Sequence, residues 1–311
     1  MEEDGYYHID HLGWVESITW ARDVIDDVTI MKGIYPSVIA ASEKLGVDEE
    51  LRGEWEKMSR IVPDYPTSDM EDAIACKRSP DGLTTYAIGR RPCKMMSEGN
   101  PNDCRLRMTF SFDLMNRETQ REHQREWETA NRTLDALPVI RLLKQGIPAL
   151  NGEVFGYAFN RVLVKAAMLG RTELIRECLP SVLRAFRTAS PCPGGERYFP
   201  NRLPLTNGRE GYSIQELGAF ADQLQAPLLQ SLANGPGHFE HVIYVVPAWP
   251  MEWDVSFELR AKGAFMVAAQ VKEKRLAWVR ILSEKGNKCL VHNPWPGKAV
   301  CVRDGEGKKR I

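Results

Sequence analysis

The sequence lacks an excess of charge of either sign, and it lacks a long hydrophobic run. Its 311 residues include 41 basic and 42 acidic side chains, interspersed along the chain, for a net charge of −1. Without a basic stripe, nucleic acid is not expected as a partner. The longest apolar stretch, HVIYVVPAW, is far shorter than the ~20 residues that a membrane-spanning helix needs. We therefore expect no membrane partner either.

The sequence also lacks CxxC motifs, although it contains seven cysteines. A reduced, cytoplasmic protein is the simplest interpretation of this cysteine usage. The first residues, MEEDGYYHID, are acidic where a secretory signal would be basic and then apolar. The cytoplasmic assignment therefore holds if the N-terminus is complete, and otherwise the localisation stays open and includes secretion.

Metal-ligand patterns are incomplete in this sequence. His8 and His11 lie three residues apart, but no further histidine or cysteine cluster completes a site with them. Cys76, Cys93 and Cys104 share one segment, which leaves either a disulfide or a metal site open there. We expect no metal and no cofactor.

The first three quarters of the chain have a helical hydrophobic period. The spacing predicts a helix over 30–45, kinked at Pro36, and a second helix that follows Asp48 and is ended by Pro63. The short link between them predicts an antiparallel pair. A short hairpin is expected over 75–89. Further helices are expected at about 116–137 (charged and exposed), 153–169, 172–188 and 214–232.

After Asn234 the period of the pattern changes from helical to two, which predicts strands. Phe265, Val267, Ala269 and Val271 would share one face of a sheet. The expected strands are HVIYVV, VSFELR, AFMVAAQV, LAWVRILS and KCLVHN. We therefore predict an α+β protein with a helical domain over 1–233 and a C-terminal, mostly antiparallel β domain over 234–311.

Three segments of the sequence resemble glycoside hydrolase family 95 and related α-L-fucosidase-like proteins. They are LLQS (228–231) with VIYVVPAWPMEWDVSFELRAKGAFMVAAQ (242–270), CLVHNPWPG (289–297), and VIAASEKLGVDEELRGEWEKM (38–58). The resemblance implies part of an (α/α)6 barrel, or α/α toroid, followed by a β domain. Because that family also has an N-terminal β-sandwich and twelve barrel helices, the chain resembles its C-terminal half, and an upstream-encoded N-terminal half is an implied partner.

The resemblance implies hydrolysis of an O-glycosyl bond with inversion. This reaction needs a protonated acid and a carboxylate base separated by roughly 6.5–9.5 Å, so that a water molecule fits between them. The family's acid precedes the first helix pair, and the matching position is Glu16 in GWVESITW, where the flanking residues depart from the family's motif. The other interpretation of Glu16 is an ordinary acidic residue at a helix start.

The family's base is an aspartate at the start of its last barrel helix. The matching position in SIQELGA is Gln215, whose amide cannot take a proton from water, and Glu216 follows it. Either Glu216 acts as the base or the base is missing, because Ser213 and Glu216 also fit a helix capping box. Asp222 is a further acidic candidate by position, as is Glu210.

Four tryptophans are candidates for sugar binding or for packing. Trp14 and Trp20 flank Glu16, and with Gln215 they are the implied substrate-binding residues. Trp249 and Trp253 lie in a proline-bracketed corner before the β domain, where packing against the helices is the favoured interpretation.

Two functions follow from these observations. The first is a fucosidase-like glycoside hydrolase, of which this chain is the C-terminal portion, acting on the terminus of a glycan or polysaccharide. The second is a non-catalytic relative that binds carbohydrate or serves as a scaffold. The glutamine at position 215 favours the second function, and the family resemblance favours the first.

Overall fold

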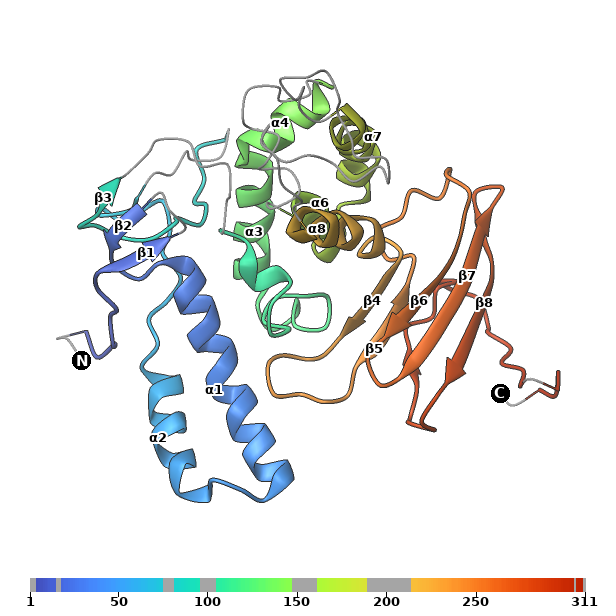
Figure 1. Cartoon of the computed structure of the whole chain (residues 1–311), viewed down its shortest axis with the longest axis horizontal. Helices are drawn as coiled ribbons and strands as arrows, with labels where there is room; N and C mark the ends of the chain where they lie inside the picture. The colour runs from blue at the N-terminus through green and yellow to red at the C-terminus, as the bar shows by residue number, and fades with distance from the viewer. Residues whose placement is uncertain are drawn as a thin grey trace.

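The computed structural model describes residues 4–14, 18–74, 81–95, 105–146, 161–188, 214–304 and 306–309. Within these ranges the chain forms seven α-helices and three small sheets, so it is a mixed α+β protein. Figure 1 shows strands β4–β8 gathered on one side of the molecule and the α1–α2 pair projecting on the other, with the remaining helices between them.

The N-terminal part combines a small sheet with a helical hairpin. Strands β1 (Leu12–Trp14), β2 (Ile18–Ala21) and β3 (Lys94–Met95) pair in antiparallel fashion. Helix α1 (Ile25–Leu45) begins five residues before the predicted start and packs against α2 (Glu49–Arg60), which confirms the helix pair. Gly46 ends α1 in the left-handed conformation (φ 68°), which glycine adopts without a Cβ penalty.

The central helices enclose the main core. Its largest fully buried side chains include Leu106, Leu134, Leu143 and Leu163. The helices are α3 (Gln124–Ala136), α4 (Pro138–Lys144), α6 (Val162–Met168), α7 (Thr172–Thr188) and α8 (Ile214–Gln225). The prediction of α7 is confirmed, whereas the first part of the helix predicted over 153–169 lies outside the described residues.

The predicted helix over 116–137 is wrong in its start and in its exposure. Residues before Gln124 form turns instead, because Asn116 Oδ1 accepts a hydrogen bond from the Glu118 backbone N–H (2.8 Å) and Thr119 Oγ1 accepts one from the Asn116 N–H (3.0 Å). The helix itself buries one face, including Ala130 and Leu134. Its charged residues lie on the other faces. The many charged residues in the sequence therefore led to the wrong prediction that the whole helix is exposed.

The helix predicted over 214–232 ends early. Helix α8 stops at Gln225, and strand β4 (Leu229–Leu232) follows it. Pro227 explains the change, because proline disfavours the helical conformation of the residue before it and lacks an N–H. The last three residues of the LLQS motif therefore lie in the mostly buried strand β4 rather than at a helix end. The predicted division at 233/234 falls between β4 and β5 (Val242–Val245). Because these two strands pair with each other, the division would separate two strands of one sheet.

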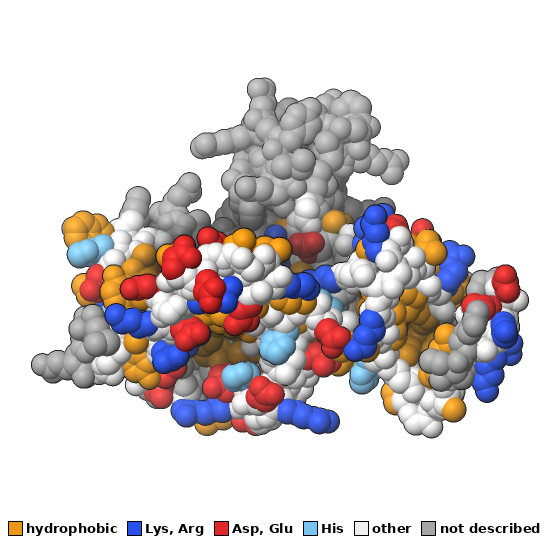
Figure 2. Space-filling model, turned by 90° about the horizontal axis from the view of Figure 1, so that it is seen from below, with side chains coloured by type: hydrophobic (Ala, Val, Ile, Leu, Met, Phe, Trp, Pro, Cys, Tyr) orange, Lys and Arg blue, Asp and Glu red, His pale blue; other side chains and the backbone are white. Residues whose placement is uncertain are grey.

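The C-terminal strands follow the predicted alternation. The sheet β6–β7–β8, comprising Val255–Ala261, Phe265–Lys272 and Arg275–Ser283, is antiparallel. The predicted inward residues of β7 (Phe265, Val267, Ala269 and Val271) are all buried, as predicted. Strand β9 (Leu290–Val291) pairs with β5 in parallel, which the alternation did not predict. Figure 2 shows hydrophobic side chains between charged ones over this part of the surface.

The hairpin predicted over 75–89 is described only in part, because residues 75–80 lie outside the described residues. Next to the gap, Ala73 forms an antiparallel bridge with Arg90, and the Ile74 N–H donates to the Gly89 carbonyl (2.9 Å). The return segment also pairs with the chain before the predicted hairpin. Tyr86 forms an isolated bridge with Thr67, and the Ala87 N–H donates to the Pro66 carbonyl (2.8 Å). The Tyr86 N–H also donates to Thr133 Oγ1 of α3 (2.8 Å), so this segment is held against the central helices.

Candidate functional site

The residues predicted from the family resemblance fall mostly at the margins of the described structure. Glu16 lies outside the described residues, and the nearest described segments before and after it are β1 and β2 rather than a helix. Trp14 lies in β1, and Gln215 and Glu216 lie in the first turn of α8, but the side chains of these three residues are also outside the description. Of the five predicted catalytic and substrate-binding residues, Trp20 is the one whose side chain is described.

Trp20 and the Trp249–Trp253 pair are described. Trp20 is half exposed, and its ring meets the ring of His11 edge-on, with centroids 4.6 Å apart. Trp249 packs against both the central core and the core of the C-terminal strands, and its indole N–H donates to the Trp253 carbonyl (2.9 Å). Both tryptophans therefore pack against the core, as expected, but each remains partly exposed rather than largely buried.

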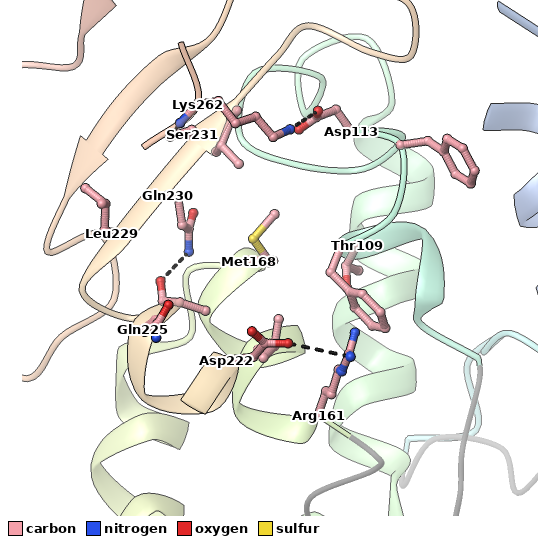
Figure 3. A pocket seen from close by; sticks show the side chains of 15 residues that line it. Thr109, Asp113, Arg161, Met168, Asp222, Gln225, Leu229, Gln230, Ser231 and Lys262 are labelled. Carbon is pink, nitrogen blue, oxygen red and sulfur yellow. Dashed lines mark hydrogen bonds and ion pairs between the residues drawn. The ribbon is translucent and has the colours of Figure 1, made fainter. Parts of the chain in front are cut away.

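A cavity of about 420 Å³ lies where the central helices meet β4 (Figure 3). Its wall comes from the 109–113 segment, α6, α8, β4 and the turn between β6 and β7. The lining residues are Thr109, Phe110, Phe112, Asp113, Arg161, Val164, Met168, Asp222, Gln225, Ala226, Leu229, Gln230, Ser231, Leu232 and Lys262. Such a volume lies within the ~300–1,000 Å³ typical of small-molecule sites.

One wall of the cavity holds Asp113, which is fixed by several partners. Its carboxylate accepts hydrogen bonds from Lys262 Nζ (2.8 Å), the Ala233 N–H (3.3 Å) and Asn116 Nδ2 (3.3 Å). Asp113 and Phe112 both have positive φ (55° and 58°), so the chain turns sharply here and directs the carboxylate toward the strands. Lys262 thereby links the β6–β7 turn to the helical part.

The 109–113 segment is positioned by a glycine of α1. A Cβ atom at Gly33 would lie 2.2 Å from the Phe112 ring, so only glycine allows the ring to pack onto the helix there. This contact and the Asp113–Lys262 pair hold the segment from two sides. The cavity wall is therefore set by residues that lie far apart in the sequence.

The opposite wall holds a second acid–base pair. Asp222 of α8 lies 3.6 Å from the Arg161 guanidinium (Figure 3), and Arg161 also lies over the Phe110 ring, 5.5 Å from its centroid. Asp222 is the acidic candidate that sequence position had indicated, seven residues after Gln215. Each of the two cavity carboxylates therefore faces a cation.

Gln230 contributes a buried amide to the same wall. Only 5% of the residue is exposed, and its Nε2 donates to the carbonyls of Ala167 and Ala226, each at 3.0 Å. Its Oε1 is buried and has no hydrogen-bond partner among the described residues. Nothing in the sequence pattern indicated this, because the motif containing Gln230 was interpreted as the end of a helix.

A separate group of buried charges lies at the start of α1. Asp26 is ion-paired with Arg107, and Lys165 of α6, nearly fully buried, lies close enough to act on the carboxyl electrostatically. Burial raises the pKa of Asp26, and the two cations only partly oppose this shift. Burial and the neighbouring Asp26 also raise the pKa of Asp27. This pair was not among the predicted site residues, although two adjacent acids in the first turn of a helix are a visible signal.

The comparisons with known proteins assign no family. Neither the scan against protein-family models nor the search of curated proteins finds a match. Within the described ranges, no group of three or more histidine, cysteine or acidic side chains is placed to hold a metal ion. None of the described helices combines the length and apolar character that crossing a membrane requires.

Proposed function

We propose that this chain binds carbohydrate and is related to the fucosidase-like glycoside hydrolases, with a sugar bound in the cavity between α6, α8 and β4. The observation that carries this proposal is the cavity's lining, in which two carboxylates, two cations and two amides surround a volume of about 420 Å³. A sugar presents many hydroxyls, each both donor and acceptor, so it can satisfy such a mixed lining. The aromatic and apolar residues Phe110, Val164 and Met168 offer contact for its C–H surface.

The architecture of the resembled family is part of the same proposal. In this proposal the helices form part of an α/α toroid, the strands form a β-sandwich domain, and an upstream-encoded half completes the protein. Supporting this, α1 packs against α2, α7 packs against both α4 and α6, and the strands β4–β9 follow the helices in the chain. Trp249 joins the two parts by packing against both cores.

Binding is tested by calorimetric titration of the purified chain with neutral monosaccharides and with oligosaccharides. Asp222→Asn should weaken binding about tenfold or more, because a hydrogen bond to a charged group contributes about 1.5–3 kcal/mol. Asp69→Asn is the matched control, since Asp69 is exposed and does not line the cavity. Failure of every sugar to bind, or equal loss in both variants, would contradict this proposal.

Hydrolysis is the second candidate function, and the family resemblance favours it. An inverting hydrolase needs an acid that stays protonated near neutral pH. Burial raises the pKa of Asp26 in that direction, but Asp26 is paired with Arg107 and lies outside the lining of the cavity. The resemblance assigns the acid to Glu16 and the base to Glu216 instead, with Trp14, Trp20 and Gln215 at the substrate. These assignments remain proposals, because Glu16 and the side chains of Glu216, Gln215 and Trp14 lie outside the described residues.

The hydrolytic activity is tested on aryl glycosides and polysaccharides, with and without an upstream-encoded partner. Glu16→Gln, Glu216→Gln and Asp26→Asn compare the three acids directly. Loss of at least about a hundredfold in kcat is expected for a general acid or base. Inversion is checked by proton NMR of the anomer first released. A chain that binds sugar but hydrolyses none of these substrates, alone or with its partner, has the binding function only.

A further inference from the structure

Gln230 presents a buried hydrogen-bond acceptor at the cavity wall that the protein leaves unused. Its side chain is nine-tenths buried, and Oε1 has no partner among the described residues. A buried acceptor without a partner is unfavourable, and native proteins seldom retain one without a reason. A group that enters the cavity and donates a hydrogen bond would remove this penalty.

The orientation of the Gln230 amide is fixed by its other atom. Nε2 donates both of its hydrogens, one to the Ala167 carbonyl and one to the Ala226 carbonyl, each at 3.0 Å. A flipped amide would place Oε1 against these two carbonyl oxygens, which is repulsive. Figure 3 shows the amide nitrogen directed at the turn after α8. The unused atom is therefore an oxygen and needs a donor.

The rest of the cavity indicates which kind of donor is suitable. Asp113 pairs with Lys262 and Asp222 pairs with Arg161, so the charges in the lining balance. The Oε1 oxygen would repel an anionic group placed near it. An ammonium group would lack a free carboxylate partner in the lining, because Asp113 and Asp222 are both already paired. A neutral hydroxyl group remains, because its O–H can donate to Oε1 while its oxygen accepts from another group.

Access to Oε1 requires an adjustment of the wall, because this atom is buried. Met168 and Gln230 both line the cavity. Methionine has an unbranched side chain that changes rotamer readily, so Met168 lets the wall adapt to a ligand without a change in the backbone.

We propose that Gln230 is a specificity-determining residue, whose Oε1 accepts a hydrogen bond from one particular hydroxyl of a neutral sugar in the cavity. This inference rests on the proposed sugar binding and adds a rule of selection to it. A sugar that lacks this hydroxyl leaves the acceptor unpaired, and it should therefore bind about tenfold or more weakly. Sugars altered at positions that point to solvent should bind unchanged.

The probes are glucose, galactose, mannose, xylose, arabinose, fucose and rhamnose, followed by every monodeoxyfluoro derivative of the one that binds most tightly. A C–F group keeps the size of a hydroxyl but cannot donate a hydrogen bond. Affinities are measured by calorimetry on the full chain, on Gln230→Met and on the control Gln225→Met. Gln225 lines the same cavity but is exposed, so the same substitution there removes an amide without removing the buried acceptor.

The expected result is one derivative that binds at least about tenfold more weakly than its parent to the full chain and to Gln225→Met, but not to Gln230→Met. Equal discrimination by the full chain and Gln230→Met would overturn the role of Gln230 and leave sugar binding intact. Absence of binding by every parent sugar would overturn the proposed function, and this inference with it.

A folding defect in Gln230→Met is checked by circular dichroism, since the substitution also leaves two carbonyls without a donor. If the variant does not fold, a crystal structure of the full chain with the tightest-binding sugar decides the question. A sugar hydroxyl within hydrogen-bonding distance of Oε1 supports the inference, and a sugar bound elsewhere overturns it.

Discussion

The sheet β6–β8 and the hairpin α1–α2 are both local units with amphipathic sequences, yet they are buried to very different degrees. In the sheet, Val267 and Ala269 are completely buried, and the inner face packs into its own core. In the hairpin, α2 has no buried residue at all, and Leu51 on its apolar face remains 42% exposed. Both units were predicted from hydrophobic period alone.

The difference between these units is explained by what covers them. The sheet has a second layer that includes Trp249 and Trp295, and the Trp295 indole donates to the Leu276 carbonyl (3.0 Å). The hairpin is held near the N-terminal end of α1. Near the other end of α1, the Lys44 ammonium group lies over the ring of Phe239, in the segment that leads to β5. An amphipathic period therefore predicts an element, whereas its burial depends on a partner that the local sequence does not reveal.

The largest expected effect concerns the layer that covers the sheet. Trp249→Ala should lower the free energy of unfolding by about 3–5 kcal/mol, the usual range for a core aromatic, because this residue packs against both cores. Urea denaturation measures the change. Trp278→Ala is the control, since Trp278 lies on the outer face of the sheet and is 42% exposed. If Trp249→Ala lowers the free energy of unfolding by less than about 1 kcal/mol, the Trp249–Trp253 pair is not a packing element, and a ligand-binding role is indicated instead.

The next effect compares the two units directly. Val267→Ala removes two buried methyl groups and should cost about 2 kcal/mol, whereas Leu51→Ala should cost less than about 0.5 kcal/mol, because alanine is a good helix former and the site is exposed. Thermal unfolding of both variants provides the measurement. Similar losses in the two variants would mean that α2 is covered in solution, and the comparison between sheet and hairpin would then fail.

A smaller effect tests the contact between α1 and the segment that leads to β5. Gly237 has φ +79°, and a Cβ there would lie 2.7 Å from the Pro36 carbonyl oxygen. Gly286 has a similar φ of +70° with nothing within 4 Å of its Cβ position. Gly286→Ala should therefore cost about 1 kcal/mol from backbone strain alone, and Gly237→Ala about 2 kcal/mol. Equal losses in unfolding free energy would show that the segment moves away from α1 without penalty.

The sequence predicted elements better than their ends or their partners. Helices α1, α2 and α7 and strands β5–β8 follow hydrophobic period, which is a local property. The end of α8 was missed because apolar residues continue at a helical spacing of four through Phe220, Leu224 and Leu228, although Pro227 by itself indicates a break. The parallel pairing of β5 with β9 was missed because it joins segments separated by three other strands.

The candidate site was predicted less completely, for a related reason. Asp222 was found from its position on the last helix, but Asp113 and Lys262 lie far apart in the sequence and meet only through the fold. The role of Gln230 depends on two carbonyls, at Ala167 and Ala226, that fix its amide. Such partners are set by tertiary packing, and no local pattern of residue types reveals them.

The smallest expected effect concerns the attachment of the hairpin at the start of α1. The imidazole of His8 lies between two carboxylates, with Nδ1 2.6 Å from Asp23 and Nε2 2.8 Å from Asp4. Arg90 also reaches Asp23, at 3.4 Å, and Arg22 lies nearby at 3.9 Å. The network thus joins the N-terminal segment to the residues just before the helix, and the protonated imidazole can donate to both carboxylates at once.

The charge state of His8 should make the stability of this attachment depend on pH. Burial alone would lower the pKa of His8, but the hydrogen bonds to Asp4 and Asp23 outweigh it and raise the pKa above its usual value. A pKa raised by folding stabilises the protein fully below the unfolded value of about 6.5, and this contribution is lost as pH rises through the folded value. We expect the free energy of unfolding to fall by less than about 1 kcal/mol between about pH 6 and 8, because Asp4 is half exposed and solvent weakens its share. Urea denaturation at several pH values measures the slope, and His8→Gln should flatten it. A slope that persists in His8→Gln would assign the pH dependence to another group, and the attachment of α1 would then not depend on His8.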